Sequence, residues 1–213
     1  MKNTICVHES EIPPEHHPDR WSKDLIGGPQ VPTQAGFSLG VAEYHAAQFG
    51  ELQVHPDQEE VYFISGVGQI RIGDQVFDVK PGSMFRLAPG TRHATRRTGP
   101  ESVRVVYAHA NPELPPTIKS GAGISIHDNA ELPPTLKSAM GISAHDKAEF
   151  GAAKAHDDNE ALYVLSGVGQ IQVGDQALDV RPGCAVYVPP HIPHATRTTR
   201  PEPIRTLFAH GAA

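Results

Sequence analysis

The sequence predicts an all-β protein built from two tandem barrels of one kind, and three observations lead to this prediction. First, the stretch beginning at His55 recurs from His156, and 24 of the 46 positions aligned between 65–110 and 166–211 are identical without a gap. Second, short runs rich in Val, Ile, Phe and Tyr alternate with Gly and Pro turn signals. Third, no segment sustains a helical apolar stripe for three turns. A long fixed repeat indicates repeated structural units.

The first copy shows the expected elements in order. Turn signals such as Gly73-Asp74 and Pro81-Gly82 divide it into short apolar runs. The segments "IRIGDQVFDV" and "IQVGDQALDV" each predict a hairpin around Gly-Asp. The strands expected in this copy are Glu60–Ser65, Gly68–Ile72, Gln75–Val79 and Met84–Leu87. An all-β sandwich or barrel in each half follows.

The repeat divides the 213 residues into two domains. We expect an N-terminal arm at 1–36, barrel one at 37–111, a linker at 112–140 and barrel two at 141–213. The segment Glu113–Ala130 recurs at once as Glu131–Ala148, which indicates a duplicated spacer with an extra strand or arm. The arm is expected to lie over a barrel or a partner subunit.

Composition excludes several classes of function. A formal charge of −6 provides no basic field for nucleic acid, and no phosphate-binding glycine motif appears. No apolar run approaches the roughly 20 residues of a membrane span. The N-terminus lacks the basic start and apolar stretch of a signal peptide, so a cytoplasmic location is expected. Cys6 and Cys184 fall in unrelated places, which predicts two free thiols in a reducing compartment.

Each half contains two histidines and one glutamate suited to binding a metal. A His precedes a Glu by four positions, a spacing that puts both side chains on one face of an extended strand. A second His follows a Pro-rich turn and begins a strand. These residues are His55, Glu59 and His93 in the first half, and His156, Glu160 and His194 in the second. Two imidazoles and a carboxylate that meet inside a barrel form a facial metal-binding set with open positions.

These residues, with the glycines around them, resemble the cupin superfamily, and the doubling resembles a bicupin. The first cupin motif, G(x)5HxH(x)3-4E(x)6G, is matched by His55, Glu59 and Gly66, and again by His156, Glu160 and Gly167. The second motif, G(x)5PxG(x)2H(x)3N, is matched by Gly82, Gly90 and His93, and by Gly183, Pro189 and His194. The resemblance covers 40–110 and 141–211. It implies two double-stranded β-helix (jelly-roll) barrels and a metal centre.

The first His of the family motif is replaced in both halves, by Gln53 and by Lys154. Gln53 can offer a carbonyl oxygen, so barrel one has four potential ligands: Gln53, His55, Glu59 and His93. A protonated lysine is a poor ligand and repels a divalent cation. Lys154 is expected to pair with Glu160 or to contact an anionic substrate. We therefore expect Fe, Mn, Ni or Zn in barrel one and weakened or lost metal binding in barrel two.

Other residues recur in both halves and have a structural interpretation first. Arg96/Arg197 and Arg104/Arg205 suit an anionic ligand, but such residues more often pair at a barrel rim. Tyr62/Tyr163 and His109/His210 line the interior or face outward depending on a strand register that the sequence leaves open. His191 replaces a motif glycine and could add a ligand near His194, but a loop histidine without function is its simplest interpretation.

Two classes of function remain. In the first, a metal-dependent enzyme of dioxygenase, isomerase or lyase type acts on a small oxygenated organic substrate, with Glu59 as a ligand or a catalytic base. The alternative is a non-catalytic bicupin that binds a small ligand, or a structural one with relic metal sites. The partners expected are a small molecule and, through exposed barrel edges, a second copy of the chain in a homodimer, with no nucleic acid and no membrane.

Overall fold

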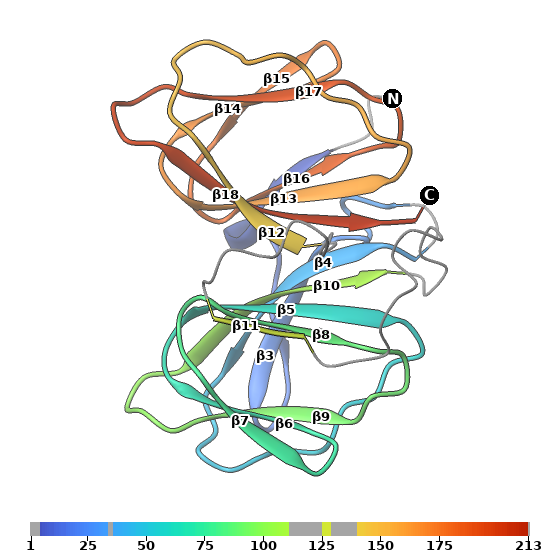
Figure 1. The fold of residues 1–213 in the computed structure, drawn as a ribbon, viewed down its shortest axis with the longest axis vertical. Coiled ribbons are helices and arrows are strands. Elements are labelled where there is room, and N and C mark those ends of the chain that lie inside the picture. Colours follow the sequence, from blue (N-terminus) through green and yellow to red (C-terminus); the bar gives the residue numbers. More distant parts are fainter. Residues whose placement is uncertain (1–4, 34–35, 111–124, 129–139, 213) are drawn as a thin grey trace. The chain divides into compact units, whose positions relative to one another are not determined.

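The computed structural model describes residues 5–33, 36–110, 125–128 and 140–212. The described residues form β-strands joined by turns, with one short 3-10 helix at Glu9–Glu11, which confirms the predicted all-β class (Figure 1). None of the described helices is long and apolar enough to cross a membrane. The chain separates into two compact units, one of 1–12, 25–38 and 138–213, and the other of 13–24 and 39–137.

Barrel one consists of two sheets built mainly from the first copy of the repeat. Its larger sheet has the strand order β11-β8-β5-β10-β4-β3-β2, and its smaller sheet has the order β7-β6-β9. The strands are β2 (Glu15–His16), β3 (Arg20–Ile26), β4 (Ser38–Tyr44), β5 (Gln58–Ser65), β6 (Gly68–Ile72), β7 (Gln75–Val79), β8 (Ser83–Leu87), β9 (His93–Arg97), β10 (Val103–Ala110) and β11 (Ser125–Asp128). The four strands expected from the sequence are all present, two of them slightly longer.

Barrel two repeats this plan. Its sheets have the orders β1-β16-β13-β18-β12 and β15-β14-β17. The strands are β1 (Cys6–His8), β12 (Met140–His145), β13 (Asn159–Ser166), β14 (Gly169–Val173), β15 (Gln176–Val180), β16 (Cys184–Val188), β17 (His194–Thr198) and β18 (Ile204–Gly211). The Gly-Asp hairpins are confirmed in both barrels, with Ile72 opposite Gln75 and Val173 opposite Gln176.

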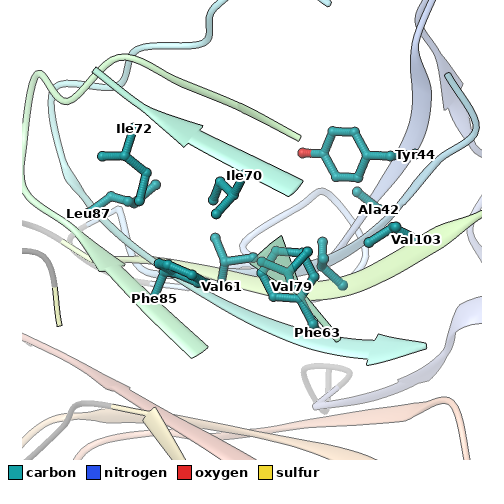
Figure 2. Close-up of a cluster of buried hydrophobic side chains, with 11 residues drawn as sticks. Ala42, Tyr44, Val61, Phe63, Ile70, Ile72, Val79, Phe85, Leu87 and Val103 are labelled. Carbon is teal, nitrogen blue, oxygen red and sulfur yellow. The ribbon is translucent and has the colours of Figure 1, made fainter. Parts of the chain in front are cut away.

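The interior of each barrel is filled from both sheets. In barrel one, Val61 and Phe63 of β5 pack against Ile70 of β6 and Phe85 of β8, and these side chains are almost fully buried (Figure 2). Side chains alternate along a strand, so Glu59 shares the inward face of β5 with Val61 and Phe63. This register settles which way the repeated tyrosines face, which the sequence left open. Tyr62 lies on the opposite face, as does its counterpart in barrel two.

A strand from outside the repeated module pairs with the equivalent strand of each barrel. In barrel two, β1 pairs with β16, with Cys6 opposite Val186. In barrel one, β11 pairs with β8, with Ile126 opposite Phe85. The first copy of the 18-residue spacer thus supplies a strand, as expected. The N-terminal arm likewise supplies strands: β1 belongs to a sheet of barrel two, and β2 and β3 belong to the larger sheet of barrel one.

The two cysteines were expected in unrelated places, and this expectation is wrong. The β1–β16 register puts His8 opposite Cys184, so Cys6 and Cys184 are diagonal neighbours on one face of the sheet. Both are free thiols. A hydrogen bond with Cys6 lowers the pKa of Cys184 to about 6, and the same bond raises the pKa of Cys6. The sequence could not reveal this contact because it joins segments at opposite ends of the chain.

Candidate metal centre

Three elements bring the predicted ligands of barrel one together. Glu59 lies near the start of β5, with its side chain directed into the barrel. His55 precedes this strand in the "HPDQE" turn, and His93 begins β9. The backbones of Gln53 and His93 exchange hydrogen bonds of 2.8 and 3.0 Å, which hold the His55 segment against β9. The family spacing thus has a physical basis, since the turn and the two strands place three donors at one end of the barrel.

The donor atoms lie at distances suited to a shared cation. In barrel one, Glu59 Oε2 is 3.0 Å from His93 Nε2 and 3.8 Å from His55 Nε2. One ligand atom from each of the three residues lies within 4.8 Å of the others. Ligands bound at about 2.1 Å and separated by roughly 90–110° around a metal are about 3.0–3.4 Å apart. The three residues that the sequence predicted are therefore brought together.

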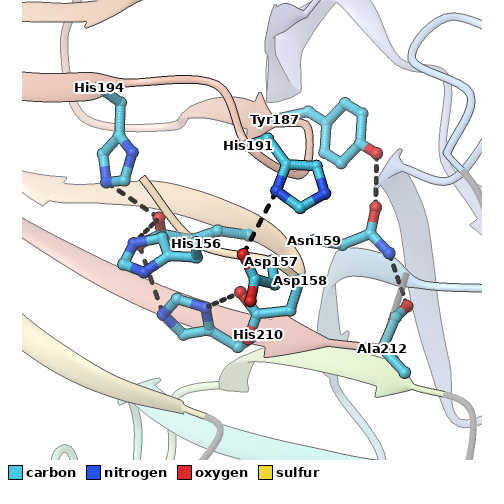
Figure 3. A network of polar contacts seen from close by, with 10 residues as sticks. His156, Asp157, Asp158, Asn159, Tyr187, His191, His194, His210 and Ala212 are labelled. Atoms are coloured by element: carbon cyan, nitrogen blue, oxygen red, sulfur yellow. Dashed lines mark hydrogen bonds and ion pairs between the residues drawn. The ribbon is translucent and has the colours of Figure 1, made fainter. Parts of the chain in front are cut away.

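Barrel two has the same arrangement. Glu160 Oε2 is 3.2 Å from His156 Nε2 and 3.0 Å from His194 Nε2. A third imidazole, that of His210, places its Nε2 3.6 Å from Glu160 Oε1. Figure 3 shows the rings of His156, His194 and His210 converging on one place inside the barrel. The lysine that replaces the first motif His has therefore not dispersed this cluster.

One oxygen of each glutamate lacks the hydrogen bond that a buried carboxylate oxygen needs. Among the described residues, the buried Oε2 atoms of Glu59 and Glu160 have no hydrogen bond of normal geometry, despite the imidazole nitrogens 3.0 Å away. In barrel one, Nδ1 of His93 lies 3.1 Å from the carbonyl oxygen of Thr91. When Nδ1 donates to that carbonyl, the neutral ring turns the lone pair of Nε2 toward the carboxylate. A lone pair facing a carboxylate oxygen is repulsive unless a cation or a proton lies between them, so the residues fit a metal.

The pKa shifts reflect this close packing of opposite charges. Burial raises the pKa of Glu59, but the nearby His93 and the other imidazoles outweigh burial and hold the pKa below its usual value. Burial lowers the pKa of His93, and Glu59 more than reverses this effect. Glu160 and His194 behave in the same way in barrel two. The pKa of His55 is lowered, chiefly by burial. Both glutamates are thus held as carboxylates, the form that binds a metal.

The residues that replace the first motif His lie differently in the two barrels. The Gln53 amide is half-buried, and its Nε2 donates a 3.5 Å hydrogen bond to the hydroxyl of Tyr44. Lys154 is exposed. Within the described part of the chain, the ion pairs of Glu160 are with histidines, and Lys154 is not among its partners. The expected pairing of Lys154 with Glu160 is therefore absent from the structure.

His191, Arg96 and Arg197 make contacts that are consistent with structural roles. The imidazole of His191 is 73% exposed and lies 3.3 Å from Asp157, away from the converging rings. Arg96 donates two hydrogen bonds to Gln69 and covers the ring of Phe49 at 4.7 Å. Its counterpart in barrel two makes the same contacts with the equivalent Gln and Phe. These pairings support the structural interpretation of Arg96 and Arg197.

Four polar residues join the site without having been predicted as ligands. His109 and His210 were left undecided between interior and exterior, and both face inward. They contact Asp57 and Asp158, which the sequence analysis did not single out. The available signal was their recurrence in both halves, because Asp57 and Asp158 fall at the same place in "HPDQE" and "HDDNE".

The comparison with known families agrees with the motifs and the fold. The cupin domain model matches residues 40–109 and 144–210, well over half of the chain. The protein belongs to the cupin family. This bicupin is similar in structure to protein YlbA from E. coli, with a TM-score of 0.76, 13% sequence identity and coverage of 96% of this chain and 89% of that one.

A second similar structure is a mutant of the oxalate decarboxylase OxdC from Bacillus subtilis. Its TM-score is 0.74, its sequence identity is 13%, and the match covers 100% of the bicupin and 78% of that chain. At this level of identity the likeness shows the fold alone. No curated protein sequence matches the bicupin.

Proposed function

We propose that the bicupin binds a divalent transition metal (Fe, Mn, Ni or Zn) in barrel one and acts there on a small oxygenated organic molecule. The observation that carries this proposal is the buried Glu59 carboxylate, which has an imidazole on two sides and an Oε2 atom without a hydrogen bond of normal geometry among the described residues. Barrel two is the weaker site, because Lys154 brings a positive charge close to His194, one of its ligands, and to the neighbouring His145.

The residues of barrel one have distinct roles in such a reaction. His55, Glu59 and His93 hold the metal, and Gln53 offers a further oxygen. A metal held there supplies a Lewis acid for a carbonyl or enolate oxygen, or a redox centre for dioxygen. The side chain of His55 is 33% exposed and that of Glu59 only 9%, so solvent and substrate reach the ligands from the His55 side.

Glu59 and Tyr44 supply the proton chemistry. The Glu59 carboxylate is a ligand or, when it leaves the metal, a base for a proton on carbon next to a carbonyl. Burial raises the pKa of Tyr44 to about 12, so its hydroxyl keeps its proton at neutral pH and can donate a hydrogen bond to a substrate oxygen. Isomerisation, decarboxylation and oxygenolytic cleavage all fit this arrangement.

Metal analysis of the purified full chain tests the proposal. We expect about one Fe, Mn, Ni or Zn ion per chain, nearly all of it lost in His55→Ala and most of it kept in His156→Ala. Equal loss from both variants would contradict the preference for barrel one. A metal-free protein that also binds none of these ions on titration would refute the proposal. With free metal at about 100 times its Kd, binding stabilises the fold by about 2.7 kcal/mol, which removal by EDTA reverses.

The reaction class requires a separate assay. Oxygen uptake and product analysis with diketones, catechols, hydroxy acids and oxalate separate oxygenolytic from non-oxidative chemistry, and oxalate is included because a structural neighbour is an oxalate decarboxylase. Turnover that disappears in Glu59→Gln supports an enzyme. Metal binding without turnover of any compound supports the non-catalytic alternative, a metal-containing protein that binds a small ligand.

A further inference from the structure

The missing first histidine of the cupin motif leaves each metal site one imidazole short, and another histidine lies where it can replace that ligand. In barrel one this residue is His109 on β10, directly opposite Glu59 on β5. In barrel two it is His210 on β18, directly opposite Glu160 on β13. Side chains that face each other across neighbouring strands lie on the same side of the sheet. Each histidine is therefore on the inward face with its glutamate.

Ring contacts place both histidines beside the predicted ligands. The His109 ring is 4.7 Å from the His55 ring, centroid to centroid, and tilted 73° to it. The His210 ring is 4.9 Å from the His156 ring and tilted 87°. In barrel two, ligand atoms of His156, Glu160 and His210 all lie within 4.8 Å of one another. The same relation holds in barrel one for His55, Asp57 and His109.

An aspartate orients each of these histidines. Nδ1 of His109 lies 3.2 Å from the Asp57 carboxylate, and Nδ1 of His210 lies 3.4 Å from the Asp158 carboxylate. A proton on Nδ1 makes the hydrogen bond to the aspartate and leaves the lone pair of Nε2 available to bind a metal. In barrel two, Nε2 is the atom that faces Glu160, at 3.6 Å. Metal-binding histidines commonly donate their other ring N–H to a carboxylate in this way, which fixes the tautomer and the ring direction.

The residues at the first motif position leave this role open. The Gln53 amide donates through Nε2 to the Tyr44 hydroxyl and can offer a metal only an oxygen, and Lys154 is exposed, so neither residue supplies the missing imidazole. The geometry points to His109 as the fourth ligand of the metal in barrel one, positioned by Asp57, with His210 and Asp158 as the equivalent pair in barrel two. This inference rests on the proposed metal binding. Each site then has three histidines and one glutamate as ligands. One of the three histidines comes from β10 or β18 instead of from the first family motif.

Titration of the metal-free full chain with Co²⁺ tests the inference, because the visible spectrum of Co²⁺ reports its ligands. The variants are made in a Glu160→Gln background, so that barrel two lacks its carboxylate and barrel one is observed. His109→Ala is expected to weaken Co²⁺ binding at least 100-fold and to change the spectrum. Asp57→Asn is expected to weaken binding about 10- to 100-fold, as loss of an orienting partner does.

Two controls separate this inference from the proposed function. His16→Ala removes an exposed histidine of the same unit and should leave binding unchanged. If His93→Ala abolishes binding while His109→Ala behaves like His16→Ala, the fourth-ligand inference is wrong and the proposed function stands. If His93→Ala binds Co²⁺ as tightly as the background protein, both are wrong.

Loss of folding must not be mistaken for loss of a ligand. Circular dichroism and thermal melting of each metal-free variant show whether the barrel is intact. If His109→Ala does not fold, Asp57→Asn decides the question, because the Asp57 side chain is 30% exposed and tolerates replacement by an amide of the same size. Unchanged Co²⁺ affinity and spectrum in that variant would overturn the inference.

Discussion

Gly66 closes the first cupin motif, and its replacement with alanine tests why the motif requires glycine there. Gly66 follows β5 with a φ of +79°, and a Cβ atom would lie 2.2 Å from the backbone oxygen of Ser102. Gly73, in the hairpin turn, also has a positive φ (+57°), but no atom lies within 4 Å of its added Cβ. The two glycines thus share a backbone conformation and differ in the space around them.

The expected costs follow from this difference. At Gly73, alanine strains the backbone by about 1–2 kcal/mol, and the stiffer unfolded chain returns about 0.4–1 kcal/mol. The net loss of about 1 kcal/mol lowers Tm by about 2–4 °C in a protein of this size. At Gly66 the backbone of Ser102 must also move by nearly an ångström, an overpacking that adds about 1–3 kcal/mol. We expect a total fall in Tm of about 5–15 °C.

Thermal unfolding followed by circular dichroism measures both effects. Because Ser102 leads into β10, which carries His109, the Gly66→Ala variant should also bind metal more weakly in barrel one. Gly167→Ala serves as a second test, since its Cβ would lie 2.4 Å from the backbone oxygen of Pro203. If Gly66→Ala melts within the range of Gly73→Ala, the close approach of the backbone is not what requires glycine in the motif.

Three further predictions concern residues outside the metal site. The rate of alkylation of Cys184 by iodoacetamide should rise with pH around a midpoint near 6, because the thiolate is the reactive form. In Cys6→Ala this midpoint should move toward 9. An unchanged midpoint would contradict the hydrogen bond between the two thiols. His191→Gly should raise Tm by about 1–4 °C in a thermal melt, because it relieves a positive φ of 64° at a cost in unfolded-chain entropy. Arg96→Lys should destabilise by about 1 kcal/mol in urea unfolding, because lysine cannot make the two hydrogen bonds to Gln69; a change below about 0.3 kcal/mol would argue against this role.

The fold could be predicted because its signals are local and occur twice. Apolar runs, the Gly-Asp hairpins and the motif glycines each depend on a few neighbouring residues, and the second copy repeats them. His55 and Glu59 could be paired for the same reason, as they are four positions apart. His93 required the resemblance to a known family, because its contact with Glu59 spans 34 positions.

The rest of the site depends on pairings that local patterns do not determine. β10 returns beside β5 after four intervening strands, so no local pattern indicates the register that sets His109 opposite Glu59. A slip of one residue in that pairing would have turned His109 outward. The contact between Cys6 and Cys184 was missed for a related reason, since β1 lies outside the repeat and offers no second copy for comparison.

β8 pairs with β11, which lies soon after it in the chain, whereas β16 pairs with the distant β1, and this difference affects the order of folding. In barrel one, Ile126 pairs with Phe85 across 41 positions, whereas in barrel two Cys6 pairs with Val186 across 180 positions. Closing the longer loop costs about 1.3 kcal/mol more in chain entropy. During synthesis, β11 is available to pair with β8 of barrel one as soon as residue 128 has emerged. The β1 strand leaves the ribosome early and must wait for β16, so barrel two acquires this strand late and folds the more slowly.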